Sequence, residues 1–194
     1  MLRRMLGLGL VGLVLAGCAS VRTVESEVQT FSTLAALPAQ ATYRFERLPS
    51  QQAQPQRQLQ VEGMAEQALA LVGLRRDEAQ AHYTVQLGVR VEQEDRLDWS
   101  DAWWYGPGLH SWRYGHLGRW PGPWAHATPW YQREVSLALR DTATGQVVYE
   151  THALEEGLWS DTANLLPVLF RSALTDFPAP SPGAHPRRVE LPLP

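Results

Sequence analysis

The sequence has no lysine and no isoleucine, and it contains a single asparagine and a single cysteine. Without lysine the chain cannot form a Schiff base through its own side chains, and it has no P-loop lysine for nucleotide phosphates. One cysteine excludes an intrachain disulfide and a metal site built from several cysteines. We therefore expect a fold that is stabilised by packing alone and a protein that uses no cofactor.

The N-terminal residues have the pattern of a bacterial secretion signal. Arg3 and Arg4 precede an uncharged apolar run from Met5 to Ala16, as the basic and apolar regions of a signal peptide do. A membrane-spanning helix needs about 20 apolar residues, and this run is too short. The run ends in Leu15-Ala16-Gly17-Cys18, which resembles a lipobox, the motif at which bacterial lipoproteins are cleaved and lipidated. The pattern predicts that residues 1–17 are a cleaved signal peptide.

The resemblance to a lipobox makes Cys18 the expected lipid attachment site. It implies a diacylglyceryl thioether on the sulfur and an acyl chain such as palmitate on the amine. Two or three acyl chains hold a protein stably on a membrane, whereas one chain does so only marginally. Ala19 stands where an aspartate is typical of inner-membrane retention, so the resemblance implies the outer membrane and a domain that faces the periplasm. The alternative is an ordinary signal peptide in which Cys18 is incidental.

The composition of the remaining chain limits the class of partner. Without residues 1–17 there are 177 residues, which is enough for one domain with a substantial core. This part has 15 arginines against 20 acidic residues, a net charge of −5. Such a surface does not favour the phosphates of nucleic acid, so no nucleic-acid partner is expected.

After an extended segment at residues 19–37, the first strand in the expected order, hydrophobic spacing predicts four further strands and two amphipathic helices. The strands are expected at residues 41–48, 82–92, 134–140 and 146–154, and the helices at 59–72 and after an N-cap at Ser160, with a polar linker at 51–60. Gly73 is placed to end the first helix, and Gly145 to form the turn between the last two strands. Residues 18–40 are expected to be a lipid-anchored lead-in. Six prolines among residues 178–194 predict a C-terminal tail without regular structure.

The order of these elements predicts the fold class. A single α+β domain is expected over residues 41–177, with an antiparallel β-sheet and two helices packed on one face. A long aromatic insert, residues 97–131, interrupts the domain between two strands.

Several of these features together resemble one protein family. They are the lipobox, the strand after Ala41, the helix that ends at Gly73-Leu74, the strand after Ala81-His82-Tyr83, the hairpin with Asp141 and Gly145, and the aromatic interruption. The chain is similar to the bacterial lipoprotein family that carries domain of unknown function 4136. The resemblance implies a periplasm-facing α+β lipoprotein domain, and it implies no activity and no catalytic residues. This insert has more tryptophan and histidine and less glycine than the glycine-rich versions in the family.

The insert is the main candidate for a binding surface. Residues 99–131 contain seven of the eight tryptophans. The candidate surface consists of Trp103, Trp104, Tyr105, Trp112, Tyr114, Trp120, Trp124 and Trp130. Such rings stack on sugars, pack on proteins or lie among lipid headgroups. The alternative is that they fold back and cover a face of the sheet, which would spare the protein a large exposed apolar patch. Both interpretations stay open, and the second is favoured.

Polar residues in and near the insert suggest two further sites. His110, His116 and His126 are candidate metal ligands, but their spacings of six and ten residues match no short metal motif, so no metal is expected. Asp98 and Asp101 close an acidic run that begins at Glu92. Paired carboxylates can act as general acid and base, although charged residues at the end of a strand more commonly protect its edge.

Taken together, the sequence predicts a non-catalytic, membrane-anchored envelope lipoprotein that is not an enzyme. Its expected partners are the membrane, through lipidated Cys18, and an envelope protein or glycan, through the Trp/Tyr/His-rich insert. The alternative is a hydrolase of an envelope polymer, peptidoglycan or another glycan, that uses carboxylates and a histidine near the insert.

Overall fold

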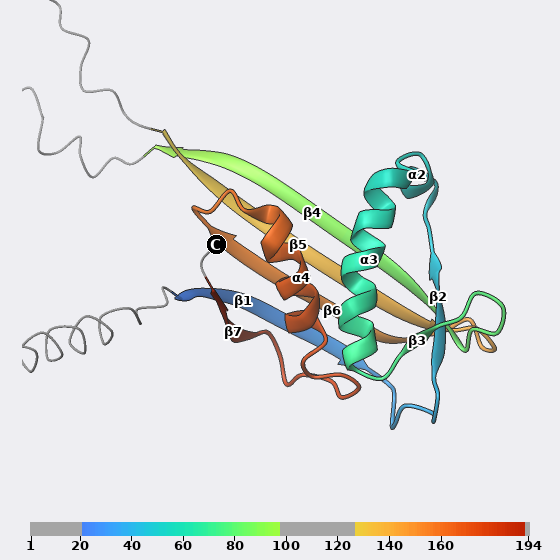
Figure 1. The fold of residues 1–194 in the computed structure, drawn as a ribbon. Helices are drawn as coiled ribbons and strands as arrows, with labels where there is room; N and C mark the ends of the chain where they lie inside the picture. The colour runs from blue at the N-terminus through green and yellow to red at the C-terminus, as the bar shows by residue number, and fades with distance from the viewer. Residues whose placement is uncertain (1–20, 98–126, 193–194) are drawn as a thin grey trace, which may run out of the picture.

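The computed structural model describes residues 21–97 and 127–192 (Figure 1). Seven strands of the described residues form one sheet in the order β3-β2-β4-β5-β6-β1-β7. The strands are β1 (Val21–Ser32), β2 (Thr42–Glu46), β3 (Arg75–Arg76), β4 (Tyr83–Leu97), β5 (Ala127–Asp141), β6 (Val147–Gly157) and β7 (His185–Pro192). The helices are α2 (Pro49–Gln52), α3 (Pro55–Leu71) and α4 (Thr162–Ala173).

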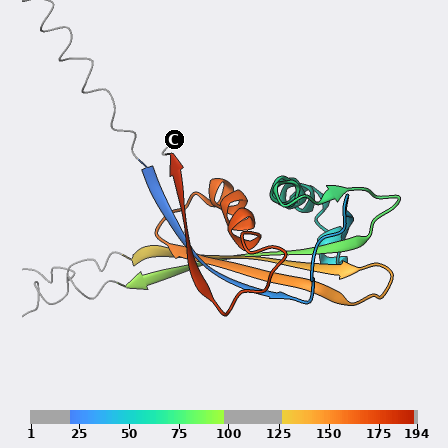
Figure 2. The same ribbon diagram turned by 90° about the horizontal axis from the view of Figure 1, so that it is seen from below.

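Helices α3 and α4 lie side by side on one face of the sheet (Figure 2). The core lies between them and the sheet, where Leu69, Val85, Tyr149 and Phe170 are fully buried. Apolar residues at every second strand position and every third or fourth helix position create this single interface. The predicted α+β class, with helices on one face, is confirmed.

The expectation of a purely antiparallel sheet is wrong, because the sheet is mixed. β2 runs parallel to both β3 and β4, with Phe45 opposite Val85, whereas the other neighbouring strands are antiparallel. The cause is the connection between β2 and β4, which passes through α3. A crossover helix returns the chain to the end of the sheet where β2 began, and the next strand then pairs in parallel.

The N-terminal end of the described chain contributes β1, where an extended segment was expected, and the C-terminal end contributes β7, which was not predicted. β1 lies within the expected lead-in, and it pairs with β6 on one side and β7 on the other. β7 lies within the proline-rich tail, so the expectation of a tail without regular structure is wrong for residues 185–192. Proline is tolerated in an edge strand, where one side of the backbone needs no ladder partner. Arg187 of β7 also forms an ion pair with Asp176.

The polar segment 51–60 is helical and is not the predicted linker. It contains the end of α2 and the first turns of α3, and Gln58 is already buried. Gly73 has a φ angle of 86° and ends α3, and Leu74 folds back into the core, as predicted. Gly145, with a φ of 71°, lies in the turn between β5 and β6, which is also as predicted.

Candidate functional site

Most of the predicted site residues lie outside the described part of the chain. These are Cys18, Trp103, Trp104, Tyr105, His110, Trp112, Tyr114, His116, Trp120, Trp124 and His126, together with Asp98 and Asp101. Trp130 is described: it is half-buried on β5, opposite Glu94 of β4. Residues 127–131, predicted to belong to the insert, are part of β5.

Two absences hold for the described ranges. Within residues 21–97 and 127–192 no three His, Cys, Asp or Glu side chains are grouped to hold a metal ion. Neither α3 nor α4, nor any other helix of these ranges, has the length and apolar character of a membrane span.

A cleft lies at the edge of the sheet where β2 ends. β2 stops at Glu46, opposite Gln86, but β4 continues to Leu97, so the edge of β4 is left without a strand partner from Leu87 onward. The chain turns there into α2, and Gln51 Nε2 donates a hydrogen bond of 2.6 Å to Leu87 O. This bond satisfies one backbone group of the exposed edge. The cleft beside it has a volume of about 450 Å³, within the range of small-molecule sites.

The lining of the cleft is part apolar and part polar. Leu48, Val61, Leu87, Val89 and Leu137 form the apolar part. Four amides line it as well, from Gln51, Gln54, Gln58 and Gln86. Arg57, Glu150 and His152 line the cleft too, so it offers amide hydrogen bonds, charged side chains and an apolar part to a small polar ligand such as a sugar or a short peptide.

Gly88 lines the cleft without adding a side chain to it. It lies opposite Ser136 of β5, and a Cβ atom at Gly88 would lie 2.2 Å from Ser136 Oγ. A side chain here would force that hydroxyl to move and would enter the cleft. The sequence carried a signal for this feature, since a glycine within an alternating strand often marks a close approach, but the segment that supplies the other wall was interpreted as a linker.

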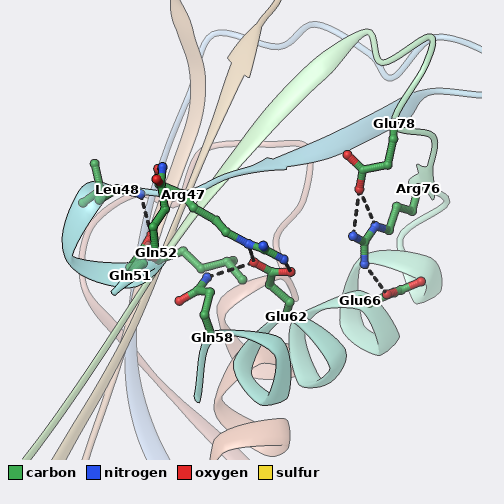
Figure 3. A network of polar contacts seen from close by, with 10 residues as sticks. Arg47, Leu48, Gln51, Gln52, Gln58, Glu62, Glu66, Arg76 and Glu78 are labelled. Carbon is green, nitrogen blue, oxygen red and sulfur yellow. Dashed lines mark hydrogen bonds and ion pairs between the residues drawn. The ribbon is translucent and has the colours of Figure 1, made fainter. Parts of the chain in front are cut away.

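An ion pair between buried Glu62 and part-exposed Arg47 fixes α3 beside the cleft. Glu62 of α3 is 1% exposed, and its carboxylate accepts hydrogen bonds of 2.6 and 2.7 Å from Arg47 and one of 3.1 Å from Gln58 (Figure 3). Burial alone would raise the pKa of Glu62, but the hydrogen bonds from Arg47 and Gln58 outweigh it and hold the pKa below its ordinary value. Glu62 is therefore charged at neutral pH and holds α3 to the segment after β2.

The face of the sheet opposite the helices carries a row of charges. His152 of β6 lies with Nε2 2.9 Å from Glu150 and Nδ1 3.4 Å from Glu134. Ser136 is the cross-strand neighbour of His152. Because both ring nitrogens face carboxylates, neither is placed to take a proton from the Ser136 hydroxyl. The arrangement has the character of a solvated ion-pair row and not of an activated nucleophile.

The family comparison covers most of the chain. Residues 27–179 match the family described as Domain of unknown function (DUF4136). The chain belongs to the DUF4136 family. The matched region starts within β1 and ends after α4, so in this DUF4136 protein the family region includes the cleft, both main helices and the strands that flank residues 98–126. No curated protein matches the chain.

Three solved structures are distantly similar to this DUF4136 chain. A PDZ domain protein from Parabacteroides distasonis has 15% identity and a TM-score of 0.49, over 88% of this chain and 38% of its own. The PelC dodecamer from Paraburkholderia phytofirmans has 16% identity and a TM-score of 0.44, over 77% of this chain and 95% of its own. A minor lipoprotein from Acinetobacter baumannii has 8% identity and a TM-score of 0.31, over 69% and 84%. Likenesses this distant say nothing about function.

Proposed function

We propose that this protein is a non-catalytic lipoprotein of the cell envelope, anchored through lipid on Cys18. The observation that carries the proposal is the position of β1. The strand begins at Val21, three residues after the cysteine of the lipobox. Three residues span at most about 11 Å, so an anchor on Cys18 would hold the sheet itself against the membrane with no linker between them. Ala19 supports the outer membrane as the location, with the domain in the periplasm.

Fractionation of cells tests the anchor. The wild-type protein is expected in the membrane fraction, and Cys18→Ser is expected in the soluble periplasmic fraction, because serine cannot carry the thioether. Ser20→Ala is the matched control, since it changes the same segment but keeps the thiol, and it should stay with the membrane. Membrane retention of Cys18→Ser would contradict the anchor.

The second part of the proposal is that the protein binds an envelope component. Two features support it: the Trp/Tyr/His-rich insert, which β4 and β5 carry at the pair Leu97 and Ala127, and the amide-lined cleft. Peptidoglycan fragments contain both sugars and peptide bonds, and they are the ligands to titrate first. Saturable binding without turnover is expected. If binding uses the cleft, Gln54→Leu combined with Gln86→Leu should weaken it, whereas Gln60→Leu on the exposed side of α3 should not.

The alternative is a hydrolase that uses Asp98 or Asp101 with a histidine of the insert. The same titration separates the two functions. A hydrolase would convert peptidoglycan, and it would lose all turnover when its essential carboxylate becomes the amide, in Asp98→Asn or Asp101→Asn. A binding protein would show no turnover in the wild type.

A further inference from the structure

Two large apolar side chains are exposed next to each other in the loop between β6 and α4, residues 158–161. Leu158 is 54% exposed and Trp159 is 53% exposed. Trp159 is the one tryptophan outside residues 99–131. Exposure of two neighbouring large apolar side chains to water costs free energy. Such a pair is typical of a surface that contacts a partner or a membrane.

A buried arginine of β5 holds this loop in place. Arg133 of β5 is fully buried, and its guanidinium donates to the carbonyl oxygen of Trp159, to Thr162 Oγ1 at 2.9 Å and to the Glu155 carboxylate at 2.7 Å. These contacts hold the Glu155 side chain before the loop, the backbone of Trp159 within it and the Thr162 side chain after it. The position of the loop backbone at Trp159 is therefore set by a buried side chain of the sheet.

The loop lies at the end of the molecule where β1 begins. Val24 of β1 packs against Leu165 and Val168 in the first turns of α4, directly after the loop. Figures 1 and 2 agree: the start of β1, the end of β7 and the loop lie together at one end. Cys18 is three residues before Val21, within a reach of about 11 Å. If Cys18 carries lipid, this end of the molecule is at the membrane surface.

We propose that Leu158 and Trp159 form a second membrane contact, which inserts among the lipid headgroups beside the anchor. The inference rests on the proposed lipid anchor and adds an orientation to it. Tryptophan favours the headgroup layer because its ring is apolar and its N–H is polar. The exposed Glu156 and the half-buried Asp161 flank the pair, so the contact suits zwitterionic lipid and not an anionic surface. Lipid at one point leaves a domain free to tilt, whereas a second contact fixes which face it turns to the membrane.

A single fluorescent label tests this contact in the full lipidated protein. Because the thiol of Cys18 carries the lipid, a cysteine introduced by Ser160→Cys is the only site for a thiol-reactive fluorophore. This position is next to the pair and leaves both side chains in place. The protein is reconstituted in phosphatidylcholine vesicles that contain a headgroup spin-labelled phosphatidylcholine. The expected result is a blue shift and a loss of emission at position 160. Ala143→Cys, at the opposite end of β6, is the matched control and should keep its emission.

Proximity to the anchor alone could quench the label, so the pair is then removed in the same background. Leu158→Ser with Trp159→Ser keeps the backbone carbonyl that Arg133 binds, and it should restore most of the emission at position 160. Equal quenching at positions 160 and 143, or quenching at 160 that the double variant leaves unchanged, would overturn the second contact. Failure of the anchor itself gives a different result: the parent protein, without an added cysteine, would react with the fluorophore at Cys18.

Discussion

Arg133 is a charged residue that the fold buries completely. It is 0% exposed, and its partner Glu155 is 4% exposed. Two charges are buried here at a cost that only their mutual contact and the added hydrogen bonds offset. The result is a fixed junction of three elements, because the guanidinium of Arg133 on β5 contacts Glu155 of β6 and Thr162 of α4.

Removal of one member of this pair should be strongly destabilising. Arg133→Met leaves Glu155 buried without its partner, and a loss of about 3–5 kcal/mol in the free energy of unfolding is expected. Urea denaturation measures it. Arg188→Met removes an exposed arginine and should change stability by less than about 1 kcal/mol. Arg133→Met combined with Glu155→Met should recover much of the loss. A single variant as stable as Arg188→Met would contradict the account.

Two glycines of one region should respond to alanine in opposite directions. Gly63 lies inside α3 with open space around it, and Gly73 has a φ of 86°, a conformation that alanine adopts at a cost. Gly63→Ala should stabilise the protein by about 0.5–1 kcal/mol, and Gly73→Ala should destabilise it by about 1 kcal/mol. Thermal unfolding of the two variants gives the signs. Stabilisation by Gly73→Ala would show that α3 does not end as described.

At the scale of elements, the attachment of α3 should depend on pH. The pKa of Glu62 lies below its ordinary value in the folded protein, so the folded state favours the charged form. The stability from this group is present above about pH 4.5 and is lost as the pH falls through the lowered folded pKa. Wild-type protein should lose more stability than Glu62→Gln between about pH 5 and 3. Glu66→Gln, at a 46% exposed side chain on the same helix, is the control and should follow the wild type.

The elements also differ in how well the sequence predicts them. β4, β5, β6, α3 and α4 were all expected, because their apolar residues alternate or recur at helical spacing over many residues. β1 lies in the segment that was expected to be extended, but its apolar spacing is loose because two of its four inward positions are polar. Ser26 and Thr30 are buried there, and Thr30 Oγ1 lies 3.1 Å from Thr151 Oγ1. β7 was missed because its prolines were interpreted as breakers, although an edge strand accepts them.

The cleft could be predicted only in part. A glycine such as Gly88 within an alternating strand often marks a close approach. The cleft itself depends on the contact of α2 with the free edge of β4, and the bond from Gln51 to Leu87 joins residues 36 apart in the sequence. Periodicity reports burial within one element and carries no information on such a contact. For the same reason the parallel pairing of β2 with β4 depends on the path of the chain and not on either strand.

At the scale of the whole molecule, the fold separates two ends and two faces. One face of the sheet carries the helices and the core, and the other carries the charged row around His152. One end contains the start of β1 and the loop with Leu158 and Trp159 (Figures 1 and 2). An anchor at Cys18 would turn this end to the membrane and leave the turn at Gly145, at the other end of β6, pointing away from it.

The central claim is that Cys18 is lipidated and begins the mature chain. Mass spectrometry of the N-terminal peptide from purified membranes tests it most directly. The account predicts a peptide that starts at Cys18 and carries a diacylglyceryl group, with or without an acylated amine. A peptide that starts at Met1, or one that contains Cys18 with a free thiol, would contradict the anchor and with it the orientation at the membrane.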